Sequence, residues 1–226
     1  MRRFALFAWI AAGMQLCVML SAIAADADLP RYKPPPRGAP SGRVALGTRT
    51  IVPPPQIWAL APNHIGLTTR EQPSLYWYAT TSGTARVALV SVGAQGMKML
   101  LNESVAASTS PRIMRIDLAR YGIRLQPGIE YQWTVALESD PRQRSQRAAI
   151  ERIAANPELT KRLDAAPRPR HAAVYAEAGI WYDAIASLGE LIEQSPSDTS
   201  LRIQRAALLD QVGLKEAAAA DRQREQ

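Results

Sequence analysis

The sequence predicts an α+β fold, in which an antiparallel β-sandwich of the immunoglobulin or fibronectin type is followed by a small helical module. One observation is a series of about seven short segments of β character, separated by turn residues, between positions 56 and 153. The other is a change to helical periodicity after Asn156, with similar residues recurring 34 positions apart. We therefore expect four parts, namely a signal peptide (1–24), a proline- and arginine-rich arm (25–42), a β-sandwich domain (43–154) and an α-helical module resembling tetratricopeptide repeats (155–226).

The N-terminus has the organisation of a secretory signal peptide. Arg2 and Arg3 precede an apolar run at 4–20 and small residues follow it, so we expect cleavage after Ala24. A retained single transmembrane anchor is the alternative, although the run is short for a bilayer span. Cys17 is the only cysteine and lies inside this run, so the mature chain would contain no disulfide and no thiolate metal site. The sequence thus predicts export to the periplasm or cell envelope, with no stable transmembrane anchor after cleavage.

The mature chain is expected to be basic. Removing residues 1–24 takes two of the 27 basic residues and none of the 20 acidic ones, which leaves a net charge of +5. No acidic residue occurs at positions 29–70, and prolines stiffen the arm. The arm is either a solvated tether or a contact for anionic lipid headgroups or wall polymers, and its charge cluster is too weak to favour nucleic acid. Residues 43–46 are predicted as a short edge strand or an ordered arm on the sandwich.

The predicted strands are short, as in other sandwiches. They comprise 56–60, 74–79, 85–92, 97–105, 112–118, 131–137 and 146–153. The segment 131–137 is the central one, because Tyr131, Trp133, Val135 and Leu137 point the same way. Leu125-Gln-Pro-Gly before it has the spacing of a tyrosine corner, in which the Tyr131 hydroxyl bonds to backbone a few residues upstream. Tyr131 and Trp133 are therefore assigned structural roles.

Strand 74–79 is apolar on both faces. Trp77 points to one face as a core residue, whereas Tyr76 and Tyr78 point to the other. The two tyrosines form either an aromatic platform for sugar rings or a protein partner, or a surface that another layer covers. The second interpretation is favoured, because the chain has helices available to cover that face.

The loop before the last strand carries three arginines, Arg142, Arg144 and Arg147. Guanidinium groups clustered in this way suit the recognition of carboxylates or phosphates. Ordinary solvated loop charge is the other interpretation and the favoured one, although this loop is the best candidate for a ligand contact in the β domain. Together with Tyr76 and Tyr78, these arginines are the candidate ligand or partner contacts.

The helical part contains an internal repeat. Gly179 recurs as Gly213 after 34 residues, which is the period of tetratricopeptide repeats. In that pattern Gly179 occupies the turn between two helices, Ala184 lies on the second helix and Pro196 marks the end of the repeat. One and a half repeats are too few to build a binding groove alone. We therefore expect the helices to bury their apolar faces on the sandwich, on the side of the two tyrosines.

Several motifs together resemble a bacterial family, domain of unknown function 928 (DUF928). They are the run at 37–49, Gly66-Leu-Thr-Thr, the aromatic segment at 73–78, Leu125-Gln-Pro-Gly, Tyr131-Gln-Trp, Asp140-Pro and Arg144-Ser. The resemblance extends from about residue 37 into the helices. The chain departs from it at Ser139, where many members have Cys, and at Ala149, where Trp is expected. The resemblance implies no activity.

Enzymatic chemistry is not expected. His64 and His171 are the only histidines and lie in different predicted modules, while Glu138 and Asp140 form an acidic pair without metal-ligand spacing. We predict no catalytic residue, cofactor or metal. The predicted function is an exported, non-catalytic envelope protein that binds an unidentified partner protein or has a structural role in the periplasm. The alternative is binding of an anionic wall or outer-membrane polymer through the basic arm and the arginine loop.

Overall fold

The structure is a computed structural model. It describes residues 29–36, 56–93, 96–106, 111–140 and 145–223. The described strands are β1 (Ile57–Ala59), β2 (Gly66–Thr68), β3 (Ser74–Ala79), β4 (Thr84–Gly93), β5 (Gly96–Ala106), β6 (Arg112–Asp117), β7 (Glu130–Leu137) and β8 (Ser145–Arg152). The helices are η1 (Leu118–Tyr121), α2 (Pro157–Ala165), η2 (Arg168–Arg170), α3 (His171–Glu177), α4 (Trp181–Gln194), α5 (Thr199–Gln211) and α6 (Lys215–Gln223). The predicted signal peptide and the predicted strand at 43–46 lie outside the described residues.

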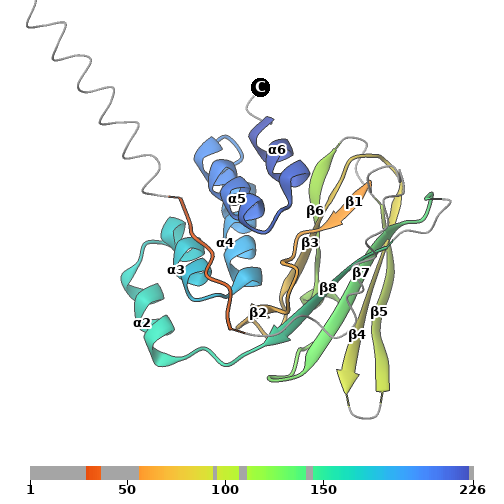
Figure 1. Cartoon of the computed structure of the whole chain (residues 1–226), viewed down its shortest axis with the longest axis horizontal. Coiled ribbons are helices and arrows are strands. Elements are labelled where there is room, and N and C mark those ends of the chain that lie inside the picture. The colour runs from red at the N-terminus through yellow and green to blue at the C-terminus, as the bar shows by residue number, and fades with distance from the viewer. Residues whose placement is uncertain (1–28, 37–55, 94–95, 107–110, 141–144, 224–226) are drawn as a thin grey trace, which may run out of the picture.

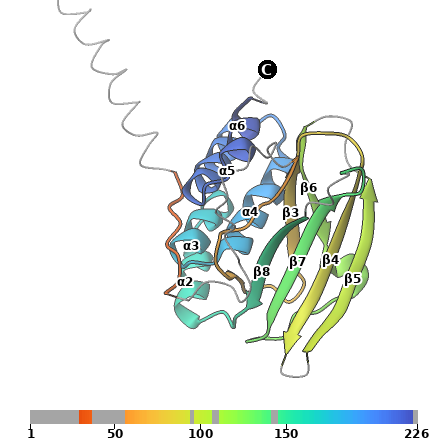
Figure 2. The same cartoon turned by 45° about the vertical axis from the view of Figure 1, so that its right-hand side comes forward.

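The described strands form two sheets, and the predicted α+β class is confirmed. A three-stranded sheet has the order β1-β3-β6, and a five-stranded sheet has the order β2-β8-β7-β4-β5. Each of the seven predicted strands is present in the described residues, although the last predicted position of the fifth, Leu118, begins the short helix η1. Figures 1 and 2 show the helices on one side of β3 and the strands β4, β5 and β7 on the other.

The prediction of a wholly antiparallel sandwich is wrong for one pair of strands. Strand β2 was not predicted, and it runs parallel to β8 with Gly66 opposite Ile150. All three residues of β2 are buried, so the strand has no alternation of apolar and polar residues that sequence reading could detect. The backbone N–H of Ile153 donates to the carbonyl of Thr68 at 2.8 Å and continues this parallel pairing.

The core between the sheets is built on two tryptophans. Trp77 on β3 and Trp133 on β7 are both fully buried and belong to one hydrophobic cluster. Burial alternates along β7 as the sequence predicted, with Tyr131, Val135 and Leu137 buried beside Trp133. The Tyr131 hydroxyl accepts a hydrogen bond of 2.8 Å from the backbone N–H of Gln126, which confirms the predicted bond to upstream backbone.

The helical repeat predicted at 34 residues is visible in the backbone. Gly179 ends α3 with φ +76° and Gly213 ends α5 with φ +79°, a left-handed conformation that glycine adopts at little cost. The two turns are closed by equivalent hydrogen bonds, Ile180 N–H to Tyr175 O at 2.9 Å and Leu214 N–H to Leu209 O at 3.0 Å. Helices α3 and α4, and then α5 and α6, therefore form two hairpins with the same turn.

Local signals fix the ends of helices α2 and α4. The side chain of Asn156 accepts a 2.7 Å hydrogen bond from Leu159 N–H and caps α2, with Pro157 at the first helical position. Helix α2 ends at Ala165, before Pro167, and α4 ends at Gln194, two residues before Pro196. The prolines act as helix stops because they lack the N–H that a continuing helix would need.

Helix α4 packs directly on β3, so the face that carries Tyr76 and Tyr78 is covered. A Cβ atom at Gly189 would lie 2.6 Å from the Tyr76 hydroxyl oxygen, so the helix and the ring approach as closely as glycine permits. At the other end of α4, the Tyr182 hydroxyl accepts a 2.9 Å hydrogen bond from Trp133 Nε1 and donates to the carbonyl of Ala149 at 3.1 Å. The expected docking of the helices on this side is confirmed.

The arm is not a solvated tether at residues 29–36. Tyr32 is only 8% exposed, and its backbone N–H donates to the side chain of Gln211 at 2.8 Å. The side-chain amide of Gln211 donates back to the carbonyl of Pro30 at 2.9 Å, and Lys33 N–H donates to Ala176 O at 3.0 Å. The tether interpretation is wrong here because the arm's backbone finds partners on the helices, which its composition could not reveal.

The close approach at Gly189 predicts an unusual response to alanine. In an ordinary helix interior, alanine is more stable than glycine by about 1 kcal/mol. Because the new Cβ would overlap Tyr76, we expect Gly189→Ala to lower the free energy of unfolding by about 1–3 kcal/mol, measured by urea denaturation. The same substitution in a Tyr76→Phe background should cost less, since the 2.6 Å contact is with the hydroxyl oxygen. A stabilised Gly189→Ala protein would contradict this packing.

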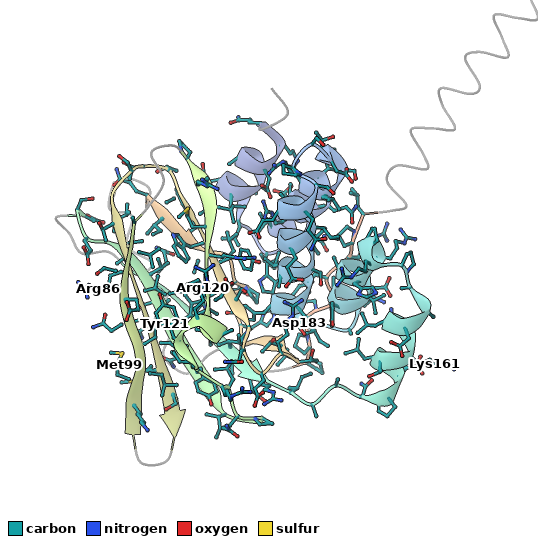
Figure 3. All side chains as sticks on the ribbon, turned by 180° about the vertical axis from the view of Figure 1, so that it is seen from behind. Arg86, Met99, Arg120, Tyr121, Lys161 and Asp183 are labelled. Carbon is teal, nitrogen blue, oxygen red and sulfur yellow. The ribbon has the colours of Figure 1, made fainter. Side chains whose placement is uncertain are left out.

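The bond at Tyr131 predicts a loss on removal of its hydroxyl. Tyr131→Phe leaves the Gln126 N–H without this partner in a half-buried site, so we expect the free energy of unfolding to fall by about 1–2 kcal/mol. Tyr121→Phe is the matched control, because Tyr121 is 41% exposed on η1 (Figure 3). Equal effects of the two substitutions in urea denaturation would contradict a special role for Tyr131.

Candidate functional site

A groove of about 590 Å³ lies between the three-stranded sheet and the helices. One wall is β6, and the other is formed by α4, α5 and α6, the elements that stand next to β6 in Figure 1. Tyr76 and Gly189, the contact that joins β3 to α4, also line the groove. The groove therefore begins where the two layers touch and opens between β6 and the second helical hairpin.

The groove runs along the backbone edge of β6. Four consecutive residues of this strand, Arg112 to Arg115, line it. Successive side chains of a strand point to opposite faces, so a wall formed by consecutive residues exposes the strand edge as well as a face. In the described part of the chain β6 pairs only with β3, which leaves its other row of N–H and C=O groups unpaired by any described strand.

Two of the arginines that line the groove are neutralised by acids. Arg115 lies 3.0 Å from Glu193 on α4 and 3.2 Å from Asp117 on its own strand. Arg205 on α5 makes two hydrogen bonds of 2.6 and 2.7 Å to the carboxylate of Asp221 on α6, and both residues are buried. These pairs hold the groove walls in place, β6 against α4 and α5 against α6.

Two further arginines carry charge that no described acid neutralises. Arg112 is exposed at the start of β6. Arg202 on α5 donates a 3.1 Å hydrogen bond to the carbonyl of Pro196, which is a neutral group. Among the described residues neither arginine forms an ion pair, so the groove has an excess of positive charge. Sequence reading missed both residues, since nothing in their local pattern links β6 to α5.

The floor of the groove contains a buried hydroxyl without a hydrogen bond. Tyr76 is 3% exposed, and its hydroxyl oxygen has no hydrogen-bond partner among the described residues. Burial raises the pKa of Tyr76, and the nearby guanidinium of Arg115 partly opposes that rise. The group is therefore a neutral phenol at physiological pH, able both to donate and to accept.

The predicted contact residues do not come together as one site. Tyr76 and Tyr78 are 3% and 6% exposed, so they cannot act as an open aromatic platform, because α4 and its neighbours cover that face. Arg147 is exposed on β8, opposite Thr134 of β7. Arg142 and Arg144 lie outside the described residues. Of the predicted contact residues that the structure describes, only Tyr76 lines the groove, and it lies at the floor of the groove.

A second candidate, the buried carboxylate of Asp183, was missed by sequence reading. Asp183 lies in the first turn of α4 and is fully buried, at the position labelled in Figure 3. It accepts hydrogen bonds of 2.5 Å from the Thr68 hydroxyl, and of 2.9 and 2.5 Å from the backbone N–H and hydroxyl of Thr69. Burial raises the pKa of Asp183, and these hydrogen bonds oppose the rise.

The surroundings of Asp183 indicate a structural role. Its carboxylate is sealed from solvent, so no substrate can reach it without opening the core. Arg70, the residue after the two threonines, forms an ion pair with Glu190, which lies further along α4. Together these contacts fix α4 to the end of β2. The only sequence signal was the Thr68-Thr69 pair, which gave no hint of a partner more than a hundred residues away.

The histidines remain apart in the fold. His64 lies 2.8 Å from the Tyr32 hydroxyl, under the arm, and the ring of His171 lies 3.1 Å from the carbonyl of Ala166. The described residues contain no group of three or more His, Cys, Asp or Glu that could hold a metal ion. None of the described helices has both the length and the hydropathy needed to cross a membrane.

Comparison with family models gives a match. The model of the family described as Domain of Unknown Function (DUF928) matches residues 42–222, which is most of the chain. Among curated proteins no match was found. The matched range includes both walls of the groove and both helical hairpins.

The raised pKa of Asp183 predicts a pH dependence of stability. A carboxyl whose pKa is higher in the folded chain than its ordinary value of 3.8 binds a proton more readily when folded. Folding is therefore favoured as the pH falls from neutral toward that value. Asp183→Asn has no such group. Relative to it, the free energy of unfolding of the unmodified protein should rise on acidification by about 1.4 kcal/mol for each unit by which the pKa of Asp183 is raised. Urea denaturation of both proteins across this pH range measures the difference between their free energies of unfolding. A stability advantage of the unmodified protein that shrinks or reverses as the pH falls would contradict the raised pKa.

Proposed function

We propose that this chain, which belongs to the DUF928 family, is an exported, non-catalytic protein of the bacterial cell envelope that binds a segment of another protein in the groove between β6 and the helices. The observation that carries the proposal is the groove itself, with an unpaired strand edge on one wall and uncompensated arginines on both. Surfaces of this kind bind partners through backbone pairing and charge.

The two layers fit such a role. The β layers are proposed to be a variant of the immunoglobulin-like sandwich, supported by the shared tryptophan core and the Tyr131 bond. The hairpins α3–α4 and α5–α6 are proposed to be tetratricopeptide-like, supported by their equivalent glycine turns 34 residues apart. Two such hairpins alone offer little binding surface. Here a sheet edge supplies the opposite wall, so a groove forms without a longer helical array.

The proposed lack of catalysis is supported by the chemistry of the described residues. The strongest candidate acid, Asp183, is sealed in the core, and the two histidines lie apart, His64 beside the Tyr32 hydroxyl and His171 beside the carbonyl of Ala166. The groove contains arginines, a tyrosine and paired acids, without an arrangement of nucleophile, base and orienting group. These groups suit recognition better than bond making.

Site-specific photocrosslinking in intact cells tests the proposal. A photoreactive phenylalanine analogue at Pro196 places the probe in an exposed position that lines the groove and leaves the groove arginines in place. The same analogue at Lys161 places the probe on α2, away from the groove (Figure 3). We expect a discrete protein adduct at Pro196 and none at Lys161. Both positions are exposed, so neither replacement should disturb folding.

Two results would contradict the proposal. One is the absence of any adduct at Pro196, and the other is equal labelling at Pro196 and Lys161. A polymer-binding role would give a different pattern, in which the protein sediments with wall material at low salt and is released as the ionic strength rises, because exposed charges are then screened. That pattern without a Pro196 adduct would replace the proposed function by the polymer alternative.

A further inference from the structure

We infer that the groove binds an extended, acidic peptide segment, which pairs as an added strand with the free edge of β6 and places its carboxylates on Arg112 and Arg202. The inference rests on the proposed function and deepens it, because it names the conformation and the charge of the bound segment. It combines an unpaired edge and a specific charge imbalance in one place.

The edge of β6 is the one sheet edge in the described part of the chain that is long and regular. Its sheet ends on the other side at β1, which has three residues, and β2 at the edge of the larger sheet is equally short. Strand β6 has six residues and pairs in unbroken register with β3. A regular edge of this kind presents alternating N–H and C=O groups to an incoming strand.

The remaining edge strand, β5, is protected against pairing. Its register with β4 shifts between Leu89 and Val90, which bends the edge. Glu103 is half-buried and stands opposite the buried Val87, so this charge lies on the face that is directed toward the core. Bulges and inward-pointing charges are the devices by which natural edges avoid unwanted strand addition. Strand β6 shows no register shift, which indicates that its edge is kept available.

Charge determines which segment the edge would accept. Four arginines and two acids line the groove, and Arg115 and Arg205 are held by carboxylates of the protein. Arg112 and Arg202 are left to face a ligand from opposite walls. Because a guanidinium binds a carboxylate through two parallel hydrogen bonds, aspartate and glutamate side chains are the complementary groups.

The occupant is a polypeptide because the edge of β6 requires one. Strand addition needs an N–H and a C=O at regular intervals along the ligand, which a wall polysaccharide or a lipid headgroup does not provide. The four residues of β6 that line the groove extend about 13 Å, which matches an equal number of peptide residues. A short acidic segment therefore fits both walls.

Selection from a random peptide library displayed on phage, with the purified protein as bait, tests the inference. We expect the enriched peptides to be rich in Asp and Glu and poor in Pro within the bound segment, since Pro cannot donate to a strand. The best peptide should shift the backbone amide signals of β6 in NMR spectra. The same peptide with alternate backbone amides methylated should bind at least about tenfold more weakly, because it loses the pairing hydrogen bonds.

Matched variants separate binding from folding. Arg112→Gln combined with Arg202→Gln should weaken the peptide by about tenfold or more, whereas Arg168→Gln, which removes an exposed arginine on η2, should leave affinity unchanged. Neither Arg112 nor Arg202 forms an ion pair within the described residues, so urea denaturation should show that the double substitution leaves the unfolding free energy nearly unchanged.

Three results would overturn the inference. They are enrichment without an excess of acidic residues, binding that ignores Arg112→Gln with Arg202→Gln, and tolerance of backbone methylation. If the probe at Pro196 captures a protein in cells while any of these holds, the proposed function survives and the nature of the bound segment is wrong. If that probe captures nothing in cells and no peptide is enriched, the proposed function and the inference fail together.

Discussion

The architecture depends on how α4 is fixed to the strands. Its first turn buries Asp183 against the donors of Thr68 and Thr69, and the next residue back, Tyr182, bridges Trp133 and the carbonyl of Ala149. An unpaired carboxylate in this position would be costly, so the two threonines and the helix constrain one another. The first turn of α4 is thereby tied to β2, β7 and β8, which brings its later residue Gly189 against Tyr76 on β3.

That constraint creates the groove as a geometric consequence. With α4 held against β3, the next strand of the sheet, β6, continues past the contact and leaves its edge beside the second helical hairpin. The layers touch where Gly189 meets Tyr76, and Arg115 and Glu193 form an ion pair between β6 and α4 beside the groove. The docking of α4 completes the hydrophobic core and also leaves the open, positively charged groove beside it.

Sequence reasoning could predict what is local and periodic. The alternation of Trp133 with its neighbours, the Tyr131 bond and the glycine turns at Gly179 and Gly213 follow from short patterns, and each is present. The features that failed or were missed depend on contacts distant in sequence. Strand β2 is too short and too buried to alternate, and Asp183 meets Thr68 across 115 positions. The groove arginines are ordinary surface residues until folding brings β6 and α5 together.

The buried pair of Arg205 and Asp221 is better explained by the groove than by stability. Removing two charges from water costs about as much as their attraction returns, so an apolar pair of similar size would stabilise the fold equally well. A bidentate pair, however, has one geometry, and here it fixes α6 on α5 at the groove wall. It also neutralises an arginine that would otherwise compete with Arg112 and Arg202. The pair therefore sets the shape of the wall and confines the free positive charge to two positions.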